Sequence, residues 1–325
     1  MGSARTLQYL VGEPAVKRSL ALFMFRAAQI LHERGGGRFD ASICRLAGLL
    51  KPKSPLPPSR LANDGVIADA VTALDRRGWA ILPWRLAAAD LDEIRRFAFS
   101  TPAYADDPTK PVTIDAAHIL REHGRYQWRI SDLIRVPAVQ RLIADSALHR
   151  IAQDYIGCRP MLTSITLWLD PVFAGGYDAH VYHYDNDGPR FLKFFIYVND
   201  VNADNGAHTY IQNSHAHVKP KKFRLSRRYD RDALLAHYGD ANEIVFAAPA
   251  GTILAEDTAG FHKGTDLRRG YRLLMQLVYG AIDIPHAEEF TCGVARAEIV
   301  GLDPEIQRVA RKFYASRITA KPQPR

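Results

Sequence analysis

Six apolar segments between residues 161 and 280 constrain the fold of this chain more than any other feature. Each is rich in β-branched and aromatic residues and is bounded by Gly, Pro, Asn or Asp, a pattern typical of β-strands. Most intervals between them are too short for a crossover helix, so antiparallel pairing is expected. We predict a mainly β core with flanking helices, built as an antiparallel sandwich or jelly roll. The segments are 161–170, 191–200, 207–213, 243–249, 251–257 and 271–280.

Helical patterns precede and follow this core. Residues 14–34 have a broad apolar surface that ends at three consecutive glycines, and residues 41–50 form a second short helix. The Pro-rich stretch 51–60 is typical of an extended linker. We therefore place a boundary after residue 60. The resulting parts are a basic N-terminal helical segment with its linker (1–60) and a main domain (61–325), made of helical support (61–160), the β core (about 161–282) and a C-terminal helical tail (283–325).

Local patterns predict several elements of the main domain. Residues 63–83 are expected to form an N-capped helix followed by a short strand that stops at Pro83. Helices are also expected at 88–99, and as one or two helices at 137–157. In the tail, Asp303 caps a helix that runs over 303–316.

The charge of the chain excludes some functional classes. The net charge is +8, but residues 1–60 hold ten Lys and Arg against three acids, so the rest is nearly neutral. A nucleic-acid-binding protein would show a basic stripe with groove-reading or aromatic elements, and none is present. No apolar run approaches the roughly 20 residues of a membrane span. The basic segment 14–34 either packs on the main body or makes a peripheral contact with a membrane surface or an acidic partner.

The cysteines and the N-terminus indicate a reducing compartment. Cys44, Cys158 and Cys292 are widely spaced and odd in number, so no disulfide framework or CxxC metal motif follows. The first residues lack the compact apolar region and cleavage site of a signal peptide. We expect a cytoplasmic protein, and the sequence does not indicate its oligomeric state.

Ionisable residues gather directly before the strand segment at 191–200, in the stretch HVYHYDNDG. On a strand, residues i and i+2 face the same side, so His183 and Asp185 can bind one metal ion. His262, at the end of a later strand segment, supplies a third ligand. Two imidazoles and one carboxylate on one face of a metal leave the opposite positions open, which is the facial triad of non-haem Fe(II) oxygenases.

Arg272 stands ten residues after His262, inside the apolar segment 271–280. A buried guanidinium is costly unless it meets an anion, and its planar fork matches a carboxylate. An arginine on a strand close to a metal site therefore suits the far carboxylate of a dicarboxylate cosubstrate.

With these motifs in place, the region from about 64 to 282 resembles the phytanoyl-CoA hydroxylase family of Fe(II)/2-oxoglutarate dioxygenases. The matching pieces are DRRGWAILP, HYDNDGPRFLKFFIYVNDVNADNGAHTYIQNSH and PAGTILAEDTAGFHKGTDLRRGYR. The resemblance implies a double-stranded β-helix (cupin-like) fold for a dioxygenase domain at 61–325, with Fe(II), 2-oxoglutarate and O₂ as cofactors. It also implies that His183, Asp185 and His262 are the iron ligands and that Arg272 binds the distal carboxylate of 2-oxoglutarate.

One motif departs from the family pattern. Many members have His-Gly-Ser at the third ligand, where the serine helps to hold the cosubstrate. Here the residues after His262 are Lys263, Gly264 and Thr265, so Thr265 is the candidate substitute. Relatives that halogenate replace the ligand aspartate by a small residue, whereas Asp185 is present here. Hydroxylation or another oxidation is therefore favoured.

Lys193 is the single charged residue of the strand FLKFFIYV. Phe191, Lys193, Phe195 and Tyr197 share one face, which we expect to point into the barrel towards the metal, while the other face packs under helices. We assign Lys193 and Phe195 to the cosubstrate site, where the lysine meets a negative group of 2-oxoglutarate or of the substrate. The alternative is that the lysine reaches a barrel edge or pairs with a structural acid.

Other residues support competing interpretations. His215 and His217 could contribute to a three-histidine cupin site, and Asp187 could steer its loop or contact substrate. His180 lies three residues before His183, so on a regular strand it faces the opposite side. The stretch 126–130 forms either core packing or a substrate wall.

The function that fits these motifs is hydroxylation of an unactivated C–H bond with release of succinate and CO₂. The substrate would be a small biosynthetic intermediate of glycan, lipid or natural-product tailoring. The basic residues of 1–60 and 219–228 would suit an anionic or carrier-linked substrate. Two alternatives stay open: a non-catalytic jelly-roll module that binds a metal or sugar, and a cupin-type isomerase.

Overall fold

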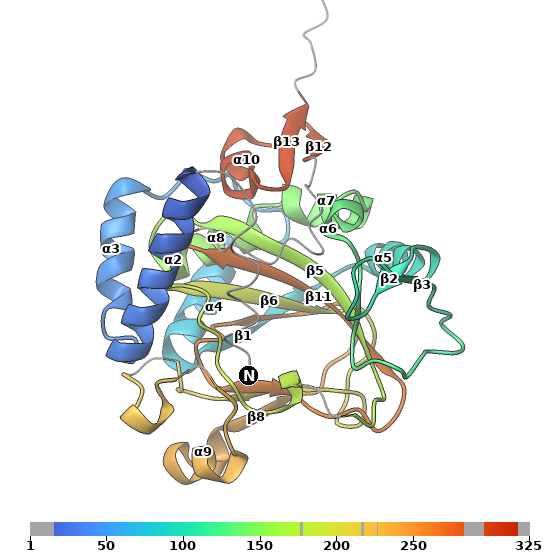
Figure 1. The fold of residues 1–325 in the computed structure, drawn as a ribbon. Helices are drawn as coiled ribbons and strands as arrows, with labels where there is room; N and C mark the ends of the chain where they lie inside the picture. Colours follow the sequence, from blue (N-terminus) through green and yellow to red (C-terminus); the bar gives the residue numbers. More distant parts are fainter. Residues whose placement is uncertain (1–15, 176–177, 216–217, 226, 283–295, 318–325) are drawn as a thin grey trace, which may run out of the picture.

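The computed structural model describes residues 16–175, 178–215, 218–225, 227–282 and 296–317, and its core is two antiparallel sheets that face each other (Figure 1). Their inner faces meet in one apolar cluster, in which Phe195 and Leu254 of the large sheet pack with Tyr210 and Phe246 of the small one. This arrangement agrees with the predicted sandwich or jelly roll. The large sheet has the order β1 (Trp79–Arg85), β9 (Thr252–Glu256), β6 (Phe191–Tyr197), β11 (Tyr271–Gly280), β5 (Met161–Pro171), β4 (Tyr126–Gln127), β2 (Ala103–Tyr104) and β3 (Pro111–Val112). The small sheet has the order β10 (His262–Gly264), β7 (His208–Ile211) and β8 (Glu243–Phe246).

Strand β6 shows why the two sides of the large sheet differ. Leu192, Phe194 and Ile196 belong to the main apolar core that helices cover, whereas Phe195 and Tyr197 belong to the cluster between the sheets. Side chains alternate along a strand, so Lys193 lies on the inner side with them. The predicted division of this strand into two buried faces is confirmed.

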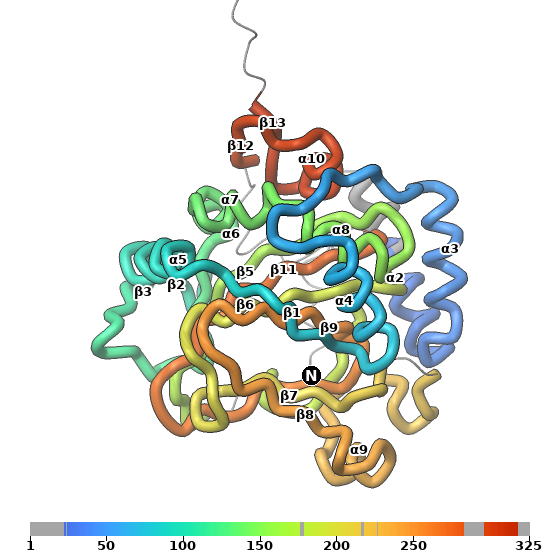
Figure 2. The backbone as a smooth tube through the Cα atoms, turned by 180° about the vertical axis from the view of Figure 1, so that it is seen from behind, coloured from blue at the N-terminus to red at the C-terminus, as the bar shows by residue number. Residues whose placement is uncertain are grey.

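Helices cover the outer face of the large sheet (Figure 2). Ile67 and Leu74 of α4 and Leu148 and Ile151 of α8 are buried in the main core against the sheet. Asn63 caps α4 by accepting a hydrogen bond from the Val66 amide, as the sequence predicts. The α-helices are α2 (Val16–Gly35), α3 (Asp40–Leu50), α4 (Asp64–Arg77), α5 (Ala88–Ser100), α6 (Ile130–Leu133), α7 (Pro137–Ala144), α8 (Ala147–Ile156), α9 (Arg231–Tyr238) and α10 (Pro304–Ala310). Short 3₁₀ turns occupy Asp178–His180, Lys221–Phe223 and Asp240–Asn242.

Helix α2 packs against the barrel. Phe25 is buried in a small cluster with Val278 of β11, and the Gln29 side chain donates to the carbonyl of Asn186 at 2.7 Å. The same helix exposes Phe23, of which 70% is accessible. A peripheral contact of this helix with a membrane or acidic partner stays a prediction. Within the described residues, no helix has both the length and the apolar character that crossing a bilayer requires.

Two sequence predictions about strands are wrong. Strand β1 continues through Pro83 to Arg85 instead of stopping there. It is an edge strand with an irregular register between Ile81 and Arg85, and an edge position tolerates a proline because no ladder donor is needed on its open side. In addition, His183 and Asp185 do not lie on a regular strand, because their segment makes only isolated bridges.

The predicted tail helix is too long. Asp303 accepts hydrogen bonds from the amides of Glu305 and Ile306, as expected of a cap, but α10 ends at Ala310. The chain then forms β13 (Tyr314–Arg317), which pairs in parallel with β12 (Ala297–Val300). The helical pattern of residues 311–316 does not decide their structure, because burial of Tyr314 in the main core and pairing with β12 favour a strand.

Candidate metal centre

His183, Asp185 and His262 come together as the sequence predicts. One potential ligand atom from each lies within 4.8 Å of the others. A pair of backbone hydrogen bonds fixes the two histidines side by side: the His183 amide donates to the His262 carbonyl at 3.0 Å, and the reverse bond is 2.8 Å. The Asp185 amide donates to the carbonyl of Thr258 at 2.8 Å. These main-chain contacts position the carboxylate although its segment is not a regular strand.

Both histidines are held in the tautomer that a metal requires. Nδ1 of His183 lies 2.9 Å from the carbonyl of Val181, and Nδ1 of His262 lies 3.0 Å from the carbonyl of Gly260. A carbonyl can only accept, so each Nδ1 carries a proton, and Nε2 is the atom of each ring that can offer a lone pair to a metal. Backbone contacts of this kind orient metal-binding imidazoles. The donor set therefore fits a divalent ion such as Fe(II).

The charges of the triad also suit a cation. Burial, with a smaller contribution from the neighbouring His262, lowers the pKa of His183 to about 3, so this imidazole is neutral at pH 7. Burial opposes ionisation of Asp185, but Lys193 and His262 together hold the pKa of that carboxyl well below its usual value. For His262, burial disfavours the charged form and Asp185 outweighs it, so its pKa is raised. Asp185 thus supplies a permanent negative charge to the centre.

Lys193 contacts the metal ligand directly. Its ammonium lies 2.7 Å from a carboxylate oxygen of Asp185 and 2.7 Å from one of Asp187. Burial opposes the charge on Lys193, but the two carboxylates raise its pKa above the ordinary value. The lysine is therefore a fixed cation beside the triad. Its assignment to the cosubstrate stays a prediction, and in this structure its partners are acids of the chain itself.

Arg272 is buried at the far end of the same inner face. Its Nε and one terminal nitrogen donate to Asp170 at 3.1 and 2.5 Å, and its other terminal nitrogen donates to the carbonyl of Gly206. Asp170 also accepts from Arg125 at 2.7 Å. A guanidinium has five N–H donors, so these contacts leave one donor on each terminal nitrogen.

Gly264 lets the backbone of β10 pass close to the guanidinium of Arg272. A Cβ at this position would lie 3.0 and 3.3 Å from the terminal nitrogens of Arg272 and 3.1 Å from the ring of His180, so a side chain here would crowd both groups. Gly264 is two residues beyond His262 on β10, so the guanidinium lies beside the strand that carries the third ligand. Its two remaining donors suit bidentate binding of a carboxylate.

Thr265 and Phe195 lie near this region but make other contacts. The Thr265 hydroxyl donates to the carbonyl of Ala207 at 3.0 Å, so its proton is already used. Phe195 is buried with its ring 4.8 Å from that of His208. Phe195 lies on the inner side of the barrel, and the roles of both residues in cosubstrate binding stay predictions.

Sequence reasoning missed a buried acid–histidine pair. Nε2 of His208 lies 2.9 Å from a carboxyl oxygen of Glu256, and the other carboxyl oxygen of Glu256 is buried without a partner among the described residues. Burial raises the pKa of Glu256 to about 8 and lowers that of His208 well below its usual value. Glu256 is directly opposite Lys193 in the sheet. The sequence does contain a signal for this pair, because His208 and Glu256 are each polar residues inside an apolar strand segment.

The residues that supported competing interpretations of the sequence make contacts other than those of the triad. Tyr126 and Trp128 are buried in the main apolar core, which supports the packing interpretation of that stretch. Nδ1 of His180 contacts Asp266 at 2.8 Å. Within the described residues, the triad is the one group that meets the spacing of a metal site. His217 of the alternative histidine site lies outside the described residues.

No protein family model matches this sequence, and no curated protein sequence matches it. Among solved structures, EctD from S. alaskensis matches in its apo form with a TM-score of 0.51 and 19% identity, over 74% of this chain and 86% of that chain. EctD with bound Fe matches with a TM-score of 0.51 and 18% identity, over 74% of this chain and 90% of that chain. The protein therefore shares the fold of EctD, and this fold is the predicted double-stranded β-helix. A further match is the non-heme alpha ketoglutarate dependent epimerase SnoN from nogalamycin biosynthesis, with a TM-score of 0.48 and 15% identity, over 68% and 84% of the chains.

Proposed function

We propose that this protein is an Fe(II)- and 2-oxoglutarate-dependent oxygenase that hydroxylates a C–H bond of a small molecule. The observation that carries the proposal is the geometry of His183, Asp185 and His262, which present two imidazole Nε2 atoms and one carboxylate to a common point. The fold, shared with an iron-bound structure, supports it. A ligand set of two histidines and one carboxylate on one face leaves room for a cosubstrate and O₂.

Fe(II) held by these residues supplies the chemistry by which 2-oxoglutarate and O₂ react, with release of succinate and CO₂. The chain's own residues position the ion and offset its charge. His183 and His262 donate neutral lone pairs whose direction is fixed by Val181 and Gly260, and Asp185 offsets one positive charge of the ion. Lys193 holds Asp185 in place through a 2.7 Å contact.

Arg272 is proposed to anchor the distal carboxylate of 2-oxoglutarate. Two terminal N–H donors remain after its contacts with Asp170 and Gly206, and a pair of this kind suits bidentate binding of a carboxylate. Asp170 and Arg125 support this role because they fix the guanidinium in a dry environment: Asp170 is fully buried. Burial works against ionisation of Asp170, but the two arginines lower its pKa, so the anchor keeps its orientation.

Buried free thiols agree with the reducing location that the sequence predicts. Cys44 and Cys158 are both unpaired and buried. The substrate is proposed to be a small biosynthetic intermediate, which a library of small metabolites can identify.

Succinate formation tests the proposed function. Fe(II)-loaded protein in air should convert 2-oxoglutarate to succinate, and a library of small metabolites should contain compounds that accelerate it. His262→Ala should abolish this turnover, whereas His118→Ala, which removes a histidine with 85% of its side chain exposed, should not. If the wild-type protein binds one ion but forms no succinate with any compound, the chain is a metal-binding module and the proposal fails.

A further inference from the structure

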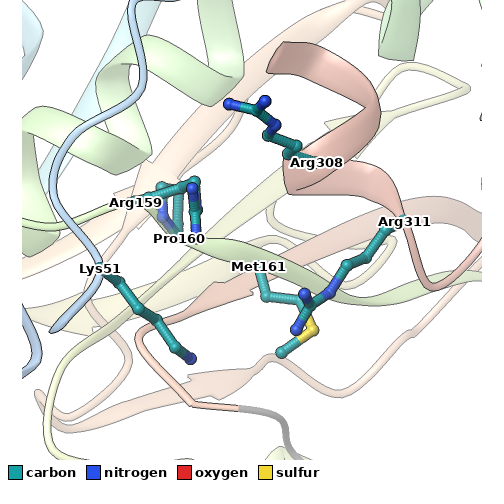
Figure 3. Close-up of a pocket in the computed structure, with 6 residues that line it drawn as sticks. All are labelled: Lys51, Arg159, Pro160, Met161, Arg308 and Arg311. Carbon is teal, nitrogen blue, oxygen red and sulfur yellow. The ribbon is translucent and has the colours of Figure 1, made fainter. Parts of the chain in front are cut away.

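A second cavity lies outside the barrel, with a volume of about 60 Å³. We call it the arginine pocket, and Figure 3 shows its lining residues. Three separate parts of the chain build it: the end of α3, the turn between α8 and β5, and the region of α10. The lining consists of Lys51, Arg159, Pro160, Met161, Arg308 and Arg311.

Four of these six lining residues are cationic, and none of the lining residues that the structure describes is an acid. Two have partners nearby: Arg308 lies 2.6 Å from Glu305, and the Lys51 ammonium donates to the carbonyl of Ala281 at 3.2 Å. The guanidinium groups of Arg159 and Arg311 have no acceptor within hydrogen-bonding distance among the residues that the structure describes. The pocket therefore carries excess positive charge.

The fold holds these charges together. The Arg159 amide donates to the carbonyl of Lys51 at 3.0 Å, which ties the end of α3 to the start of β5. Helix α10 is fixed by Ile306 and Val309, both buried in the main core. Free surface cations would separate to reduce repulsion, whereas these are anchored around one hollow. Converging arginines are the arrangement that binds planar or tetrahedral oxyanions.

The size and charge of the pocket select the ligand class. A volume of about 60 Å³ admits one phosphoryl group or a few water molecules, and not a whole metabolite. A phosphate dianion offsets more of the local charge than a single carboxylate does, and its oxygens can accept from several arginines. Met161 is directly opposite Gly280, two positions along β11 from Val278. Val278 is opposite Lys193, so the pocket lies at the same end of the large sheet as Lys193, which contacts the candidate metal ligand Asp185.

We propose that the arginine pocket binds the phosphoryl group of a small phosphate ester, whose remainder extends out of the cavity. This binding depends only on the residues of the pocket, and it would hold even if the proposed oxygenase activity failed.

Calorimetric titration of the full chain tests the proposal. The titration uses a chloride buffer of constant ionic strength with a chelator, so that phosphate finds no metal ion. Inorganic phosphate and glycerol 3-phosphate are each expected to bind at one site, while glycerol and acetate should not. Loss of one charge-assisted contact should weaken binding at least about tenfold in Arg159→Gln and in Arg311→Gln. Arg76→Gln, which removes an exposed charge on α4, should leave the affinity unchanged.

Two results would overturn the proposal. The first is that neither phosphate compound binds the wild-type chain, or that both pocket variants, folded by circular dichroism, bind as well as Arg76→Gln. The second is that inorganic phosphate binds and glycerol 3-phosphate does not, since an ester would then be excluded.

Discussion

Replacing Lys193 by Met probes the electrostatics of the metal centre most sharply. The ammonium lies 2.7 Å from Asp185 and 2.7 Å from Asp187, and 9% of the lysine side chain is exposed. Removing one partner of a buried ion pair costs about 3–5 kcal/mol because a charge is left uncompensated. The two carboxylates are 24% and 22% exposed, so water solvates them in part. We therefore expect the lower end, about 3 kcal/mol of unfolding free energy in metal-free protein.

A divalent ion should recover most of this loss, because it supplies positive charge beside Asp185. If the cost of Lys193→Met falls to about 1 kcal/mol in metal-loaded protein, the thermodynamic cycle requires the variant to bind the ion about 2 kcal/mol more tightly. That difference is roughly thirtyfold in affinity. Urea unfolding with a chelator and with saturating Mn(II), together with direct Mn(II) titration, measures both sides of the cycle.

Lys110→Met is the matched control. Lys110 pairs with Asp107 at 3.3 Å on the surface, where 81% of the lysine side chain is exposed, so its loss should cost at most about 1 kcal/mol and leave Mn(II) affinity unchanged. A Lys193→Met variant that is as stable as this control, or that binds Mn(II) no more tightly than the parent, would refute the reasoning.

Two further variants test the inner face of the barrel. Arg272→Ala should weaken 2-oxoglutarate binding to Mn(II)-loaded protein by tens to thousands of fold, from about 2–5 kcal/mol for a truncated buried charge pair. Arg125→Gln, which removes a supporting partner of Asp170 but leaves the guanidinium of Arg272, should weaken it much less, and equal effects would remove Arg272 from the site. Glu256→Gln should flatten the pH dependence of stability in metal-free protein. The pKa of Glu256 is raised from its ordinary value of 4.5 to about 8 in the folded state. Between these two pH values the folded protein keeps a proton that the unfolded chain has released. The free energy of unfolding therefore falls by up to roughly 1.4 kcal/mol per pH unit as the pH rises through this range. Parallel urea-unfolding profiles of parent and variant between pH 5 and 8 would contradict this assignment.

The three candidate ligands could be picked out by their spacing and order in the sequence, although the regular strand expected under His183 and Asp185 is absent. His183 and Asp185 are two residues apart, and His262 ends a recognisable strand segment. The alternation of β6 likewise follows from period-2 patterning and a buried environment on both sides. By contrast, β10 escaped prediction because His262–Gly264 is three residues long and has no β-branched residue.

The partners of the charged residues could not be predicted, because they depend on tertiary pairing. Asp170 meets Arg272 across β5 and β11, 102 residues apart in the chain. His208 and Glu256 are 48 residues apart and meet only because their strands face each other inside the barrel. A polar residue in an apolar strand indicates that a partner exists, but it does not say which one.

The location of the metal tests the central claim most directly. Crystals grown anaerobically with Fe(II) and 2-oxoglutarate should show one anomalous-scattering peak at the iron edge. We predict that this peak is bonded to Nε2 of His183, Nε2 of His262 and a carboxylate oxygen of Asp185. Absence of a peak between these three residues, or a peak at His215 instead, would contradict the account.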